Sequence, residues 1–420
     1  MPKFIKSPLF TIIFTIFLDA LGFAILIPII PLLLADPASN FYILPKGISV
    51  ETGYILLGLI TATFPLAQLF STSILGQFSD KIGRKPILQN TLFLTSFSYL
   101  LFAIGIAIRN IPLLFVSRAL AGISSGNISS AQAAIADVTK PQDRAKNFGF
   151  IGAAFGLGFI IGPFLGGFLS DSKIVSFFNP TLPFLFAAAL SLINALQVKK
   201  FLKETNKFIN KERVIEWHKS LIDIRKAFQL KNVRFLFFVN FLFMSGFTFF
   251  VTFMSIFLIE KFTWNQSDIG NFFSFFGLCF LITQSVVTGL VAKKFREAQV
   301  LKICILGAGL AIGLNYLAPT PLFIFLVAPL QALCMGLVFS NMGALISRSV
   351  DSHIQGEVLG INASVVALAQ LIPPIASGFI AAAFTPGTPV IIATLIVFLA
   401  GTTFIIFYKT PKGVAHIQDY

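Results

Sequence analysis

Two side chains of opposite charge, Asp19 and Arg118, fall deep within long apolar segments of this chain. Asp19 lies roughly 11 residues, or ~16 Å, from the start of the first apolar segment, and Arg118 lies at a depth of ~20 Å from the same side. A charge at such a depth is costly and is functional by default. Because the carboxyl group can titrate while the guanidinium stays charged, the pair predicts proton binding. The alternative is an ion pair that only holds two helices together.

The composition indicates which elements must hold these groups. Of the 420 residues, 56% are hydrophobic and 11% are charged, with a mean hydropathy of +0.87. Soluble domains carry about 25% charged residues, and a helix needs about 20 apolar residues to cross a bilayer. We therefore predict an all-α integral membrane protein of twelve transmembrane helices, at residues 8–34, 52–76, 86–108, 111–136, 147–170, 182–198, 234–259, 266–291, 300–318, 321–347, 357–383 and 388–408.

The net charge of +14 follows from where the basic residues lie. Between these segments, 26 of the 31 Lys and Arg residues fall on the side that holds both termini, and four fall on the other side. Cytoplasmic loops carry such an excess of positive charge. The distribution predicts a multi-pass protein of the cell inner (cytoplasmic) membrane with both termini in the cytoplasm, and it does not imply a nucleic-acid partner.

The two halves of the chain look like copies. A shift of 211 residues places Gly149 on Gly360, Pro163 on Pro374 and Gly167 on Gly378. Repeats with an even number of spans are related by an axis along the membrane normal. We expect two parallel-related six-helix bundles, at 1–198 and 234–408, with a cytoplasmic central loop at 199–233 and a cytoplasmic tail at 409–420. Apolar residues at helical spacing predict an amphipathic helix in the central loop, and a solvated linker is the alternative. These residues are Val214, Trp217, Leu221, Ile224 and Phe228.

The loop after the second segment holds a patterned group of small and charged residues, Gly76, Asp80, Gly83 and Arg84. Gly76 permits close helix approach, Gly83 permits a tight turn, and Asp80 can accept hydrogen bonds from Arg84 or from a helix N-terminus. The run Gly76–Lys85 resembles the signature G-x-x-x-D-[RK]-x-G-R-[RK] of the major facilitator superfamily. The resemblance implies a conformational latch between the halves, with Asp137 as a further member; a simple positively charged loop is the alternative.

The fifth segment carries Gly158, Gly162 and Gly166 at intervals of four, with Pro163 and Gly167 beside them. This run resembles the antiporter motif G-x-x-x-G-P-x-x-G-G, and a purely structural face of small residues is the alternative. Together with Leu18–Gly22, Leu114–Gly122 and Ile135–Thr139, it makes the chain similar to the twelve-helix drug:proton antiporters, including the tetracycline-resistance efflux proteins. Those exporters carry acidic residues in the third and ninth spans and a histidine in the eighth. This chain has none there, so we do not expect tetracycline as its substrate.

The resemblance implies a secondary active transporter that exports a small amphipathic compound by proton antiport and alternating access, as in multidrug efflux. Asp19 and Arg118 would couple the proton, and a monomer in the lipid bilayer would suffice. Spans 1, 4, 7 and 10 would line a central cavity, with Asn127, Met244, Phe247, Gln331, Met335 and Asn341 as candidate lining residues.

Two other functions stay open. One is transport of a specific metabolite, such as a siderophore or a lipid precursor, and the other is a non-transporting membrane receptor or scaffold. We do not expect an enzyme, a cofactor or a metal, because the sequence has no nucleophile–base set, metal-ligand cluster or phosphate-binding loop.

Overall fold

The computed structural model describes residues 7–139, 144–206, 209, 212, 214–230, 233–351 and 354–408, and within these ranges it contains helices and no strands. Eleven of the described helices are long and apolar enough to cross a membrane. The remaining predicted span, 8–34, is broken into α1 (Pro8–Ala24) and α2 (Ile30–Leu34). Pro28 and Pro31 lack the N–H that a continuous helix would need there. The predicted all-α membrane fold is confirmed.

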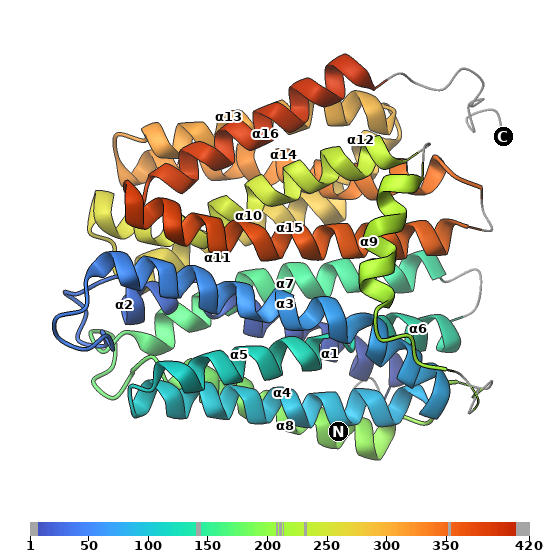
Figure 1. Ribbon diagram of the computed structural model, residues 1–420, viewed down its shortest axis with the longest axis horizontal. Helices are drawn as coiled ribbons and strands as arrows, with labels where there is room; N and C mark the ends of the chain where they lie inside the picture. The colour runs from blue at the N-terminus through green and yellow to red at the C-terminus, as the bar shows by residue number, and fades with distance from the viewer. Residues whose placement is uncertain are drawn as a thin grey trace.

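The helices form two groups, which we call the N-half and the C-half (Figure 1). Besides α1 and α2, the N-half contains α3 (Val50–Ile82), α4 (Arg84–Ala107), α5 (Ile111–Ser125), α6 (Ile128–Val138), α7 (Arg144–Ser170) and α8 (Leu182–Phe201). The C-half contains α10 (Arg234–Phe262), α11 (Gln266–Ile282), the π-helical segment η3 (Thr283–Val287), α12 (Thr288–Ala292), α13 (Glu297–Leu317), α14 (Pro321–Arg348), α15 (Gln355–Ala383) and α16 (Thr388–Phe407).

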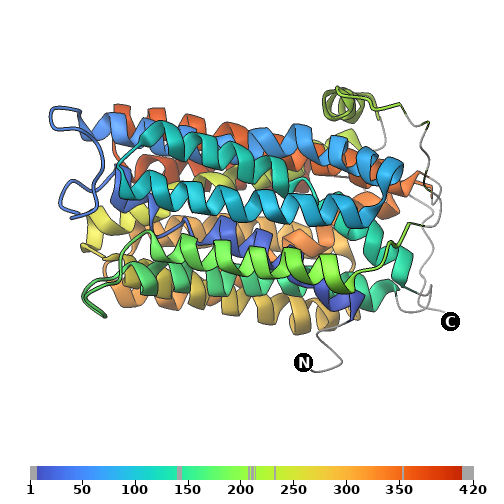
Figure 2. The ribbon, with the colours of Figure 1, turned by 90° about the horizontal axis from the view of Figure 1, so that it is seen from below.

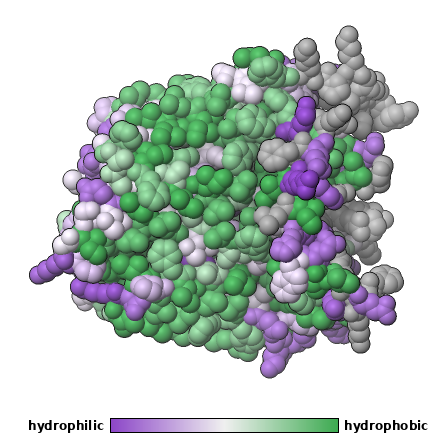
Figure 3. Space-filling view, in the orientation of Figure 1, coloured by the Kyte–Doolittle hydropathy of each residue, from purple (hydrophilic) through white to green (hydrophobic). Residues whose placement is uncertain are grey.

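The spans run side by side along the length of the molecule (Figures 1 and 2). We name its two ends after the short helices near them, the α2 end and the α9 end. Hydrophobic side chains form a broad band between these ends, and hydrophilic residues gather at the ends (Figure 3). Such a band is what the hydrocarbon core of a bilayer requires.

The two halves meet along two seams, α3 against α15 and α7 against α11. Toward the α2 end, glycines bring the backbones of the seams together. A Cβ atom added at Gly58 would lie 2.3 Å from the carbonyl oxygen of Pro374, and one added at Gly270 would lie 2.5 Å from that of Pro163. Since no larger residue fits at these contacts, the halves are closed tightly at the α2 end.

Helix α9 (Lys219–Gln229) lies across the spans rather than along them (Figure 1). It contacts α3 of the N-half and both α10 and α15 of the C-half. The hydroxyl of Ser220 donates a 2.6 Å hydrogen bond to the carbonyl of Leu69 on α3, and Trp217, just before the helix, is 60% exposed. The helix thus occupies part of the predicted amphipathic stretch. The side chains of Leu221 and Phe228 and the tail at 409–420 lie outside the described residues.

Candidate functional site: a central cavity between the two halves

A cavity of about 760 Å³ lies between the N-half and the C-half. Its walls come mainly from α1, α3, α6 and α7 on one side and α15 on the other. Asp19 lines it in mid-membrane, and Asp80 and Arg84 line it at the α9 end. Because the seams are closed at the α2 end, the described residues leave the cavity open toward the α9 end and closed toward the α2 end.

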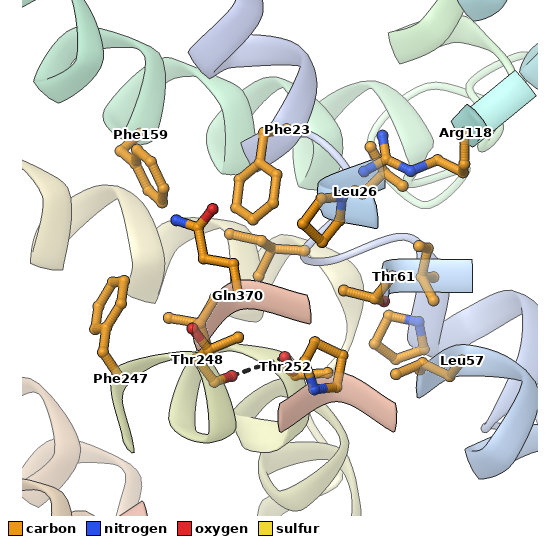
Figure 4. Close-up of a pocket in the computed structure, with 16 residues that line it drawn as sticks. Phe23, Leu26, Leu57, Thr61, Arg118, Phe159, Phe247, Thr248, Thr252 and Gln370 are labelled. Atoms are coloured by element: carbon orange, nitrogen blue, oxygen red, sulfur yellow. Dashed lines mark hydrogen bonds between the residues drawn. The ribbon is translucent and has the colours of Figure 1, made fainter. Parts of the chain in front are cut away.

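A smaller pocket of about 80 Å³ continues from this cavity toward the α2 end (Figure 4). The two spaces share Phe23, Phe159 and Gln370 as lining residues. Figure 4 shows the amide of Gln370 beside the rings of Phe23 and Phe159. The other lining residues are mostly aliphatic, with a polar minority of Thr61, Arg118, Thr248 and Thr252. A largely apolar space with a few polar groups suits a small amphipathic ligand.

Asp19 is buried on α1, with 8% of its surface exposed. Its Oδ2 atom has no hydrogen-bond partner among the described residues. A buried carboxylate oxygen without a partner is costly, and binding of a proton, a cation or a ligand group would lower that cost.

Arg118 is 3% exposed on α5, and its guanidinium lies 4.6 Å above the ring of Phe64. This contact is a cation–π interaction. Its Nε atom has no hydrogen-bond partner, and none of the ion pairs among the described residues joins it to Asp19. The expected ion pair between Asp19 and Arg118 is thus absent among the described residues of this structure.

The expected latch residues form one charge cluster at the mouth of the cavity. Arg84 lies 2.5 Å from Asp80 and 3.5 Å from Asp137, and it also donates to the hydroxyl of Ser79. These ion pairs lie within the N-half. Gly76 abuts the hydroxyl of Ser129, which a Cβ atom would meet at 3.0 Å.

Gly83 ends α3 at a φ of 108°, which only glycine adopts without strain. A Cβ atom there would also lie 2.3 Å from the carboxylate of Glu204. That carboxylate accepts hydrogen bonds from the backbone N–H groups of Arg84 and Lys85 at 2.8 and 3.1 Å. Glu204 therefore caps the start of α4, a role that sequence reasoning missed because 120 residues separate it from Arg84.

The C-half repeats the cluster with its charges exchanged. A shift of 213 residues places Arg84 on Glu297, and the shift of 211 places Asp137 on Arg348. The side chains of Glu297 and Arg348 form an ion pair of 2.5 Å. The duplication has thus kept the contact and reversed its polarity.

The glycine-rich segment of α7 presents two different faces. Gly158, Gly162 and Gly166 face α1, where added Cβ atoms would lie 2.5 to 2.7 Å from atoms of Ala20, Ala24 and Ile25. Pro163 and Gly167 face α11 of the other half. One face therefore lets α7 pack against the broken first span, and the other forms the closed seam.

Of the six candidate lining residues, Phe247 lines the central pocket and the other five line neither cavity. Met244, Gln331 and Met335 are buried in the interior of the C-half. In this structure the polar ones among these five have hydrogen-bond partners elsewhere, and a cavity-lining role for the five stays a prediction. The bonds are Asn315 to Gln331 at 2.6 Å, Asn341 to the carbonyl of Leu337 at 2.7 Å, and Asn127 to Thr91 at 3.1 Å.

Sequence reasoning missed several residues that the structure brings to the site. Thr248 and Thr252 follow Phe247 on the cavity-facing side of α10, so their spacing of four could have indicated them. Gln370 lies on α15, outside the spans named by the resemblance. The hydroxyl of Tyr99 lies against Gly22 on α1. No motif or spacing in the sequence indicated this contact. Within the described part of the chain, no cluster of three or more His, Cys, Asp or Glu residues could hold a metal.

Two helical bundles with a cavity between them, within an apolar belt, define a multi-pass membrane transporter rather than an enzyme. The model of the Major Facilitator Superfamily matches residues 12–235 and again 236–418, so the chain belongs to that family.

Known proteins agree with this assignment over most of the chain. The chain is 28% identical to the class H tetracycline resistance protein of Pasteurella multocida, over 89% of each chain. It is 26% identical to multidrug resistance protein 2 of Bacillus subtilis, again over 89% of each. The crystal structure of the human organic anion transporter MFSD10 matches with a TM-score of 0.70 at 22% identity, covering 96% of this chain and 100% of that one.

Proposed function

We propose that the protein exports a small amphipathic compound in exchange for protons. The observation that carries the proposal is Asp19, a buried carboxyl group with an unpartnered oxygen on the wall of a cavity shared by both halves. A proton bound there and a compound bound in the same cavity can each change the affinity of the protein for the other. The relatives named for tetracycline and multidrug resistance support export as the direction.

Alternating access is the proposed mechanism. The N-half and the C-half would rock about the central pocket, so that the seams open at the α2 end while the mouth closes at the α9 end. The cluster of Asp80, Arg84 and Asp137 would then meet the C-half and act as the latch. One copy of the chain encloses the whole cavity, which supports a functional monomer.

The proposed orientation places the α9 end in the cytoplasm of a bacterial cell, because the loops at that end hold most of the Lys and Arg residues. After Tyr420, we expect a fused green fluorescent protein to be active and a fused alkaline phosphatase to be inactive. In the 35–51 loop, we expect the reverse. Paired alkaline phosphatase and green fluorescent protein fusions measure this. External activity of the C-terminal fusion would contradict the orientation.

We expect little resistance to tetracycline. The spans that carry acidic residues and a histidine in tetracycline exporters lack them here, and the central pocket is mostly aliphatic and aromatic. The measurement is growth of expressing cells on tetracycline and on a panel of apolar toxic compounds. Strong magnesium-dependent tetracycline uptake into inverted vesicles would contradict the expectation.

A second candidate substrate class is an amphipathic organic anion. Arg118 is the charged residue of the central pocket, and its guanidinium has no ion-pair partner among the described residues. Such a group favours a carboxylate or sulfonate ligand, and the named substrate class of human MFSD10 agrees. The same vesicles can be given naphthalene derivatives that carry a carboxylate, an amide or an ammonium group. Preferred uptake of the carboxylate supports this class, and equal or lower uptake rejects it.

A further inference from the structure

The side chain of Tyr99 connects α4 to α1 at one particular residue. Tyr99 is 5% exposed, and its phenol fills the notch left by Gly22. A Cβ atom added at Gly22 would lie 1.4 Å from the hydroxyl oxygen and 2.2 Å from the ring carbon that bears it. No side chain other than hydrogen leaves room for the phenol, so Gly22 fixes the position of the hydroxyl.

This position lies between the two helices that carry the charges of the proposed coupling site, α1 and α5. Asp19 precedes Gly22 by three residues on α1, so the two share one face of that helix. Arg118 lies on α5, which packs against α4. Tyr99 is close enough to interact electrostatically with both Asp19 and Arg118.

The helices around Asp19 offer few other charged groups. In α7 the described side chains from 149 to 170 include no titratable group, and the one in α6 is Asp137, which is engaged with Arg84. On α8 the titratable groups are Lys199 and Lys200, at its α9 end. Within the described parts of α6, α7 and α8, no titratable group other than Asp137, Lys199 and Lys200 is therefore available to Asp19, whereas Tyr99 reaches α1 from α4.

We propose that Tyr99 is a positioning residue of the proton site, and that its hydroxyl links the carboxyl group of Asp19 to the guanidinium of Arg118. The inference rests on the proposed function, because it assumes that Asp19 carries the proton. A phenol can donate one hydrogen bond and accept another at the same time. It can therefore donate to the carboxylate and accept from the guanidinium, two groups that do not pair directly here.

The link explains how two unpaired charges can share one buried site. In this structure Asp19 Oδ2 and Arg118 Nε both lack hydrogen-bond partners, and the guanidinium is held over Phe64. A small movement of α1 relative to α4 and α5 would make or break the contacts of the hydroxyl. The proton affinity of Asp19 would then differ between the two access states, which coupling requires.

The test is an infrared titration of the purified full-length protein in lipid vesicles. The C=O stretching band of a protonated carboxyl group is assigned to Asp19 by its loss in Asp19→Asn. Tyr99→Phe keeps the ring in the notch and removes only the hydroxyl. We expect the midpoint pH of the Asp19 band to shift by about 1 unit toward alkaline pH, because the carboxylate loses a donor.

Two further variants make the result specific. Gly22→Ala keeps the hydroxyl but drives the phenol out of the notch, so it should shift the midpoint in the same direction. Tyr54→Phe removes the hydroxyl of a tyrosine that packs against Phe253 at the α2 end, and it should leave the midpoint unchanged. An Asp19 band that titrates alike in the wild type, Tyr99→Phe and Gly22→Ala overturns this inference alone. A wild-type protein in which no Asp19 band titrates overturns the proposed proton site as well.

Discussion

Asp19→Asn should abolish transport driven by a pH gradient while preserving substrate binding. The asparagine has nearly the same shape as the protonated side chain, so the cavity wall stays intact, but it cannot release a proton. Coupling between two ligands of one protein typically amounts to 5–150-fold in affinity. We therefore expect accumulation against a substrate gradient to fall by on the order of 100-fold.

The measurement is uptake into reconstituted vesicles under an imposed pH gradient, with substrate exchange in the absence of a gradient as the internal control. Exchange should continue in the variant, because it requires the cavity and the rocking motion but no net proton movement. Asp36→Asn serves as a matched control, since this carboxyl group lies in the loop after α2 and accepts a hydrogen bond from Ala38. If Asp19→Asn still accumulates its substrate when driven by pH, Asp19 is not the coupling site.

Asp80→Asn should reduce transport about tenfold or more without affecting membrane insertion. The carboxylate is bound to Arg84 in this open state, and the proposed latch requires its charge when the mouth closes. An amide can accept a hydrogen bond but cannot balance the guanidinium or interact with a helix N-terminus as a charge does. Transport rate and the amount of protein in the membrane are both measured.

Asp80→Glu is the matched control, because it retains the charge on a longer side chain and should keep more of the activity than Asp80→Asn. Transport by Asp80→Asn at the wild-type rate would show that the cluster is only a loop structure.

The spans could be predicted from the sequence because they are long apolar runs separated by charged residues or by turn residues such as Pro and Gly. The predicted span 266–291, for example, corresponds to α11, η3 and α12, which follow one another without a break as far as Ala292. The rise along a helix depends only on residue number, so the sequence also predicts a depth for Asp19 and for Arg118. The distance between Asp19 and Arg118 could not be predicted. It depends on how α1 and α5 are rotated about their axes and on the phenol of Tyr99, which packs between neighbouring helices.

Helix rotation, which the sequence does not give, also decides which residues line the cavity. Polar residues in apolar spans were expected to face the cavity, but Gln331 accepts a hydrogen bond from Asn315 inside the C-half. Sequence spacing within α14 cannot reveal a partner on α13. Gln370 shows the converse, since a polar residue of a span that was not expected to contribute lines both cavities.

The glycine contacts at the α2 end also bear on leakage of protons and ions. Where backbone meets backbone, as at Gly58 and Pro374, attraction comes from dispersion, which loses a quarter to a half of its strength when a gap of 0.5–1 Å opens. A partly separated seam would therefore lose its attraction before it admits water, which needs a wider passage. If the halves rock as proposed, half-open forms would be the least stable, and the molecule would spend its time near the two limits of its travel. A membrane that holds many copies of such a protein can keep its electrochemical gradient.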